Sequence, residues 1–211
     1  KHAKRKYDFR GANLRQATIV GGDFTESDFT NAQITAMTFK ECTVAFDQLA
    51  STTTFRSRWP GSIAFRAARI EGKADFSQLK LTGARFDLSF ADADFSAADI
   101  GGGLLGAAIT KDHLRSTSSY QHGDLVGITF AGMDLSGVDF SRQNLTSCEF
   151  AFCDLTDAIF ENAVITDTKF SRHNMNTGLT ADQIKSTWNY KHGRMEGIQL
   201  PEAVAKALHD D

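Results

Sequence analysis

The chain has 211 residues, with 23 Lys and Arg against 26 Asp and Glu, so its formal net charge is −3. Its 41% hydrophobic and 23% charged residues are typical of a folded globular protein of one or two small domains. The weak negative charge disfavours nucleic-acid binding, and no apolar run approaches the roughly 20 residues that cross a bilayer. Phe occurs 17 times against 3 Tyr and 2 Trp, which suggests a recurring position that selects one shape.

The chain begins with a basic stretch, residues 1–6, that predicts a solvated linker. It also begins without Met, and we expect it to be a piece of a longer protein.

A five-residue repeat follows. From Phe9 to Leu49, and again from Leu125 to Met175, every fifth residue is large and apolar. The residue two places earlier is usually small, and the one directly before is often Asp or Asn. A period of five fits neither a helix nor a strand, but a chain that bends at every repeat can turn all large side chains inward and stack its coils into a solenoid. The core column predicted for the second run comprises Phe130, Leu135, Phe140, Leu145, Phe150, Leu155, Phe160, Ile165 and Phe170.

The repeat is interrupted near residues 50–64 and 106–124. Three segments share the pattern Asp-x-(Leu/Ile)-x-Ser-Thr-x-x-(Tyr/Phe); they begin at Asp47, Asp112 and Asp182, 65 and 70 residues apart. Both spacings are multiples of five, so each copy starts at the same phase of the repeat. Thr110 and Thr180 are expected to cap a short helix that bulges from one corner. The copies are interpreted either as tolerated insertions with packing roles or as loops that present residues to a partner.

Residues 180–211 predict a helical cap or a joint to a following domain. A helix is expected from Pro201, with Val204, Ala207 and Leu208 on one face. An open solenoid end exposes core and unpaired edges, so a cap is needed there.

No residue set predicts catalysis, a metal site or a cofactor. Cys42, Cys148 and Cys153 occupy the small inward position and are interpreted as buried structural residues. The segment Arg56 to Pro60 is foreign to the repeat, and Arg and Trp are enriched in binding hot spots. The partner-binding candidates are Arg56, Arg58, Trp59, Trp188 and Tyr190; the alternative for Trp59 is a side chain that shields the edge of a coil.

The triplets at Ala12, Ala74 and Ala93 read Ala-(Asn/Asp)-(Leu/Phe) and resemble the pentapeptide-repeat family motif. The resemblance implies an all-β fold, a right-handed quadrilateral β-helix with four repeats per coil. It would span residues 7–179, with short helical loop insertions and a C-terminal capping helix. Roughly eight coils at about 4.8 Å each would give a rod about 40 Å long.

The segments 186–191, 195–198 and 200–202 resemble the end of the pentapeptide-repeat domain in SopA- and NleL-like HECT-type ubiquitin ligases, which enteric bacteria secrete. This resemblance implies a monomeric, non-catalytic module that recruits a host protein, such as a ubiquitin-pathway component, for a ligase domain following in cis. Such a protein is a type III effector that acts in the host cell cytoplasm.

The alternative is a free-standing DNA mimic of the bacterial cytoplasm that binds DNA gyrase, as some members of the family do. The weak charge and the interleaved basic residues disfavour it. A structural spacer without a partner is the third possibility. The interleaved residues are Arg10, Arg15, Arg66, Arg69, Arg85 and Arg142.

Overall fold

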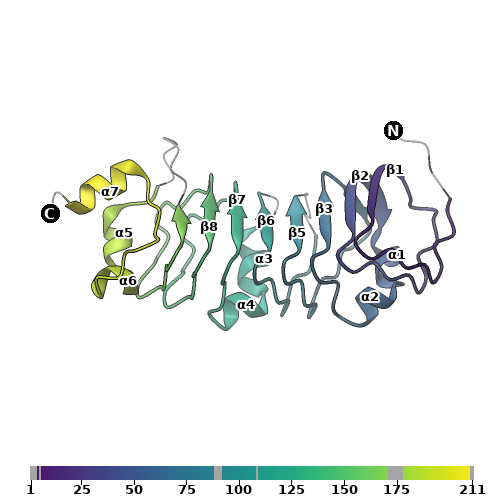
Figure 1. Cartoon of the computed structure of the whole chain (residues 1–211), viewed down its shortest axis with the longest axis horizontal. Helices are drawn as coiled ribbons and strands as arrows, with labels where there is room; N and C mark the ends of the chain where they lie inside the picture. The colour runs from purple at the N-terminus through teal and green to yellow at the C-terminus, as the bar shows by residue number, and fades with distance from the viewer. Residues whose placement is uncertain (1–3, 5, 88–91, 108, 171–177, 210–211) are drawn as a thin grey trace.

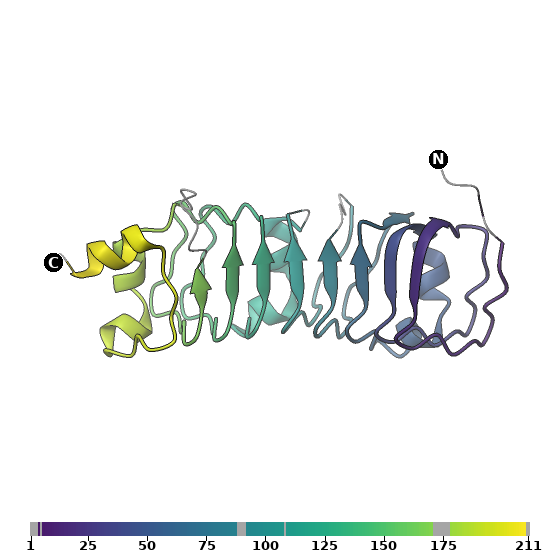
Figure 2. The same cartoon turned by 45° about the horizontal axis from the view of Figure 1, so that its top comes forward.

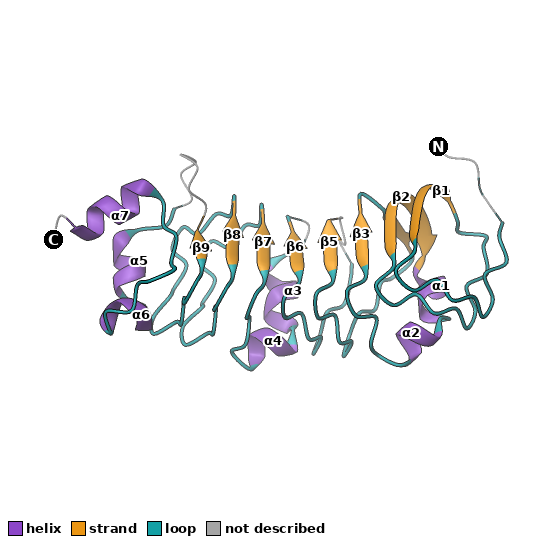
Figure 3. Cartoon of the chain, in the orientation of Figure 1, coloured by secondary structure: helices purple, strands orange, loops and turns teal. Residues whose placement is uncertain are grey.

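The computed structural model describes residues 4, 6–87, 92–107, 109–170 and 178–209. The chain forms a long rod with β1 near one tip and α7 at the other, as Figure 1 shows. A row of short strands runs along the rod, and pairs of short helices lie on one flank of it (Figure 3).

The strands and helices are short and lie in the following order. They are β1 Thr18–Asp23, β2 Thr38–Ala45, α1 Phe46–Ala50, α2 Thr53–Arg56, β3 Ala64–Arg66, β4 Arg69–Glu71, β5 Arg85–Asp87, β6 Leu104–Gly106, α3 Lys111–Ser116, α4 Ser118–Gln121, β7 Thr129–Ala131, β8 Glu149–Ala151, β9 Lys169–Phe170, α5 Ala181–Lys185, α6 Trp188–Lys191 and α7 Glu202–His209.

The strands form one parallel sheet in the order β1-β2-β3-β5-β6-β7-β8-β9, with β4 also paired to β2 (Figure 2). The register places large side chains directly over one another, for example Phe39 over Phe65 and Phe130 over Phe150. Each strand along this order therefore belongs to a successive coil, whereas β4 follows β3 within the same coil. The row of strands is one side of a solenoid.

Backbone pairing recurs on the other sides at five-residue steps. Between neighbouring coils, Asp124 pairs with Asn144, Asp134 with Asp154, and Asp139 with Ile159. Together with the sheet, these bridges define four stacked columns, so a five-residue step advances the chain by one side. The repeat and these columns give a β-helix-like solenoid; the right-handed winding that the resemblance implies stays a prediction.

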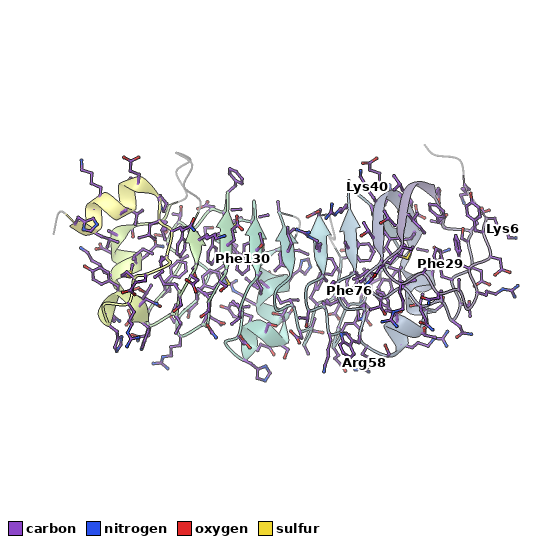
Figure 4. The ribbon with its side chains drawn as sticks, in the orientation of Figure 1. Lys6, Phe29, Lys40, Arg58, Phe76 and Phe130 are labelled. Atoms are coloured by element: carbon purple, nitrogen blue, oxygen red, sulfur yellow. The ribbon has the colours of Figure 1, made fainter. Side chains whose placement is uncertain are left out.

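The core contains two phenylalanine ladders rather than a single axial column. Phe130, Phe150 and Phe170 stack on the sheet side with ring centroids 4.9 and 5.1 Å apart. Phe140 and Phe160 stack on another side at 5.3 Å, and Phe140 meets Phe150 edge-on at 5.7 Å. The expected convergence on one axis was therefore wrong in detail. All nine predicted core side chains are at most 2% exposed, and the labelled Phe29, Phe76 and Phe130 lie inside the rod (Figure 4).

The Asp or Asn before each large residue has a backbone role. Its side-chain oxygen accepts the N–H two residues later, as Asp139 does from Ser141 at 2.8 Å and Asn144 from Thr146 at 3.2 Å. These hydrogen bonds favour the ionised form and lower the pKa of Asp139. The position thus selects a short side-chain acceptor, which explains why Asn replaces Asp there.

The predicted insertions are helix pairs within the coil and not separate bulges. Leu49, Leu114 and Ile184 belong to a column of large residues, each is at most 1% exposed, and each lies on a helix. From each of them the next side of the coil is reached after eleven residues instead of five, at Pro60, Leu125 and Met195. The six additional residues thus make room for the second helix of each pair, which is four residues long.

The helix pairs recur at every third coil. The column that contains them reads, coil by coil, Phe9, Phe29, Leu49, Phe76, Phe95, Leu114, Phe140, Phe160 and Ile184. The third, sixth and ninth coils carry α1–α2, α3–α4 and α5–α6, which Figure 1 shows along one flank. At the usual spacing of about 4.8 Å, successive helix pairs lie about 14 Å apart.

All three pairs are anchored in the same way. Thr52, Thr117 and Thr187 are at most 1% exposed, and each hydroxyl donates to the carbonyl of the column residue at 2.6–2.7 Å. A polar side chain from each second helix accepts the backbone N–H of the preceding coil at 2.7–3.0 Å. These three acceptors are Thr54, Ser119 and Asn189. As expected, Thr110 and Thr180 cap the helices that follow them.

The two ends differ from the sequence prediction in detail. Lys4 pairs with Asp23 and forms an ion pair with Glu26 at 3.2 Å, so part of the expected linker already belongs to the solenoid. At the other end α7 packs against α5 through Val204, whereas Ala207 is exposed. The repeat position Met175 lies outside the described residues.

Candidate functional site

The five predicted partner-binding residues lie at two distant places. Arg56 ends α2, and Arg58 and Trp59 follow it; Trp188 and Tyr190 lie on α6. The helix pair that contains α2 belongs to the third coil, and the helix pair that contains α6 belongs to the ninth (Figure 1). The two groups of residues therefore cannot form one site. Both groups nevertheless lie on the flank that carries the helices.

The two tryptophans differ in their surroundings. Trp59 is 65% exposed, which argues against a side chain folded back to shield the coil. Trp188 is 36% exposed and stacks on His192, with ring centroids 4.4 Å apart. Tyr190 is half-buried against the core. Trp59 is therefore the freer contact residue of the two.

A hollow of about 280 Å³ lies on the C-terminal side of α1 and α2. Its floor is apolar: Phe46, Phe55 and Leu79 contribute buried side chains, and Ala50 is exposed beside them. Its rim is formed by Arg56, Arg58, Asp75, Ser77 and Gln78. We call this feature the open hollow; Arg58, at the lower edge of the rod in Figure 4, marks its rim.

The equivalent place beyond α3 and α4 is closed by polar side chains, and we call it the closed site. By their place in the aligned copies, Lys111, Arg115, Tyr120 and Gln143 take the positions of Phe46, Ala50, Phe55 and Leu79. The Tyr120 hydroxyl donates to the carbonyl of Asp139 at 2.5 Å, and Gln143 Nε2 donates to the carbonyl of Tyr120 at 2.9 Å. These side chains hold the helix pair to the next coil.

Two charged side chains complete the closed site. Lys111 Nζ donates to the carbonyl of Ser136 at 3.0 Å and lies 3.2 Å from Asp134 Oδ2. Arg115 Nη2 approaches the carbonyl of Gly137 at 3.4 Å. Bonds to Ser136, reinforced by Lys111, lower the pKa of Asp134 to about 2. The third helix pair is covered differently, because α7 packs against α5.

A second hollow of about 440 Å³ adjoins the open one toward α4. The two hollows share the lining residues Gln78 and Leu79, and we call the two adjoining hollows together the groove between α2 and α4. At the far end the groove is lined by Asp99, His122 and Asp124. Lys80 also lines this second hollow, so its charged side chains are of both signs.

The cysteines lie in the core, as predicted. Burial raises the pKa of Cys148 to about 12 and that of Cys153 to about 11, and both thiols donate to backbone carbonyls of the preceding coil. Such thiols are protonated at neutral pH and are poor nucleophiles. Burial likewise raises the pKa of Cys42 to about 11.

Within the described part of the chain, His, Cys, Asp and Glu side chains form no group of three or more that could hold a metal ion. No described helix combines the length and the apolar character that a bilayer crossing requires. The described surface offers two hollows and exposed side chains such as that of Trp59.

These features define a solenoid protein whose distinctive surface is a flank of regularly spaced helix pairs. The family model for pentapeptide repeats matches 8 copies in the chain, over residues 8–43, 124–162 and 144–176. Over those residues the chain matches the model of pentapeptide repeats. No curated protein sequence is significantly similar to it.

Several solved pentapeptide-repeat structures resemble the chain weakly. HetL, involved in heterocyst differentiation regulation in the cyanobacterium Nostoc sp. strain PCC 7120, is 16% identical with a TM-score of 0.29; the alignment covers 78% of this chain and 87% of HetL. Full-length QnrB1, a plasmid-mediated fluoroquinolone resistance protein, is 15% identical with a TM-score of 0.32, over 99% and 97% of the two chains. At these values the likeness carries no information on function.

Sequence reasoning missed the open hollow. Its floor residues Phe46 and Leu79 read as ordinary apolar positions beside the repeat. An alignment of the helical copies that extends beyond their shared pattern could have revealed them. In that alignment, apolar residues of the first copy stand opposite polar residues of the second.

Proposed function

We propose that the chain is a non-catalytic protein-interaction scaffold whose contact surface is the helix-bearing flank. The observation that carries this proposal is the groove between α2 and α4, with its apolar floor and arginine rim, on an otherwise regular rod. A rod with a continuous buried core holds such a surface rigid, which reduces the entropic cost of binding.

The test is quantitative binding to a partner first identified by crosslinking in the source cell and then purified. Trp59→Ala is expected to weaken the affinity by about tenfold or more without lowering the melting temperature, as for an exposed hot-spot residue. A parallel loss of affinity and melting temperature would assign Trp59 a packing role. If no purified candidate binds saturably, the scaffold proposal fails.

One finer candidate is a DNA mimic that binds DNA gyrase. It is supported by aspartates that recur along one side of the rod and whose low pKa values keep them charged, such as Asp8, Asp28 and Asp94. The helical coils interrupt this series with Gln48 and His113. Inhibition of gyrase supercoiling at substoichiometric amounts of the chain would support the mimic, and unchanged supercoiling at excess chain would exclude it.

The other finer candidate is the recruiting domain of a secreted HECT-like ubiquitin ligase that acts on host proteins. It is supported by the residues around α6 that resemble the end of that domain, including the exposed Trp188, and by the position of α7 as a joint. Reading the coding sequence beyond the codon of Asp211 tests it. A ligase region with a reactive cysteine is expected there, and any other continuation would exclude this candidate.

A further inference from the structure

The three helix pairs share a scaffold but differ in what covers their C-terminal sides. Polar side chains bridge the second pair to the next coil, and the chain's own α7 packs against the third. Beyond the first pair the hollow of about 280 Å³ remains, although Phe46, Phe55 and Leu79 there are apolar. Resting on the proposed scaffold function, we propose that the open hollow is a docking site for a partner segment with one large apolar anchor side chain beside an acidic residue.

The anchor is argued from the floor of the hollow. At the closed site, Lys111, Tyr120 and Gln143 find carbonyl partners across the gap between coils. Phe46, Phe55 and Leu79 have no polar group that could make such bonds. An apolar side chain is the group whose transfer from water to this floor is favourable. The third helix pair offers an example of an apolar cover within the chain itself: α7 packs against α5, and Val204 of α7 is buried.

The acidic neighbour is argued from the rim. Arg56 and Arg58 are exposed guanidinium groups at the edge of the hollow, against one carboxylate, that of Asp75. Asp75 Oδ1 already accepts the N–H of Ser77 at 2.9 Å. Arg56 donates to the carbonyl of Ser51 and Arg58 to Gln78 Oε1, so each guanidinium is held in place and keeps further donors. Such donors suit a carboxylate.

The experiment is an amide-shift titration of the whole chain by nuclear magnetic resonance. The probe is a synthetic peptide with blocked ends, Gly-Asp-Phe-Glu-Gly. The amides of Ala50, Phe55, Gln78 and Leu79 are expected to shift saturably, with a Kd of about 1 mM or tighter. A peptide with Ala in place of Phe is expected to bind about tenfold more weakly. Absence of saturable shifts at these amides, or equal binding of the Ala peptide, overturns the proposal.

Charge reversal provides the matched control. Arg58 and Arg142 are both exposed and have nearly the same left-handed backbone, with φ 58° and 59°, but Arg142 lies beside the closed site. Arg58→Glu is expected to weaken peptide binding by about tenfold, whereas Arg142→Glu leaves it unchanged. Equal effects of the two variants, or equal shifts at the four amides with inorganic phosphate alone, overturn the proposal.

The outcome is separable from the fate of the scaffold function. If the peptide fails to bind while a purified partner still binds saturably and equally to the Arg58→Glu variant, the docking site is wrong and the scaffold stands. If neither the peptide nor any purified partner binds, both proposals fail.

Discussion

The regions that follow the first and second helix pairs have the same skeleton and opposite surfaces. In both, a buried Thr holds the second helix, and a polar side chain of that helix caps the preceding coil. They differ on the other side, where one presents Phe46, Phe55 and Leu79 and the other Lys111, Tyr120 and Gln143. A repeat architecture can thus keep its anchoring contacts constant while neighbouring positions change, because each coil contacts only its neighbours.

The largest effects are expected in the shared core. Phe76 and Phe140 occupy the same column, each in the coil that follows one of the two helix pairs, and both are fully buried. Phe76→Ala and Phe140→Ala should each lower the free energy of unfolding by about 3–5 kcal/mol, because each leaves a cavity. Chemical denaturation measures both values. A cost near zero for either variant would show that the cores of the two regions are not equivalent.

Intermediate effects are expected at the shared anchors. Thr52→Val and Thr117→Val remove a buried hydroxyl that donates to a carbonyl and accepts a backbone N–H. Each variant should lose about 1–3 kcal/mol, because buried groups remain unpaired. Comparable losses in denaturant melts would support equal anchoring, and a large difference between the two variants would refute it.

Smaller effects are expected where the regions differ. Tyr120→Phe deletes only the hydroxyl that bonds to Asp139, and should cost about 0.5–1.5 kcal/mol. The reciprocal change Phe55→Tyr supplies a hydroxyl beside the open hollow and should not destabilise the chain by more than about 0.5 kcal/mol. The two melting temperatures, measured against wild type, check this asymmetry; a destabilising Phe55→Tyr would contradict it.

The smallest effect is expected on the stability of the fold at acidic pH. Asp134 bonds to Ser136 and Lys111 at the closed site and its pKa is lowered from 3.8 to about 2. A depressed folded-state pKa stabilises the fold above pH about 3.8, and that contribution is lost as the pH falls toward 2. The melting temperature of wild type should therefore fall between pH 4 and 2 slightly more than that of Asp134→Asn, which cannot titrate. Identical acid profiles would show that Asp134 makes no such contribution.

The five-residue step was sufficient to predict the solenoid, because each large residue has to be buried at a fixed phase of the coil. Its side chains form two ladders instead of one column, since Phe rings on different sides meet edge-on, as Phe140 and Phe150 do. The phase of Leu49, Leu114 and Ile184 was visible in the sequence. Their recurrence at every third coil was not visible in the sequence. The middle of the chain departs from the five-residue step, so the number of coils between the helix pairs could be counted only in the structure.

The open hollow could not be predicted from the repeat. Phe46 and Leu79 are apolar residues beside the repeat positions, and only the stacking of coils brings them together in the lining of one hollow. The exposed Trp59 and the arginines beside it were identified from their composition alone, but their placement on the rim of a hollow required the structure.

An exchange of the two surfaces tests the central claim most directly. The triple substitution Ala50→Arg, Phe55→Tyr and Leu79→Gln copies three of the four polar residues of the closed site onto the first region, at positions where the scaffold is the same. In the amide-shift titration with the Phe-containing peptide, this variant is predicted to keep the wild-type fold and to show no saturable shift at Gln78. Wild-type binding by a folded triple variant would contradict the account.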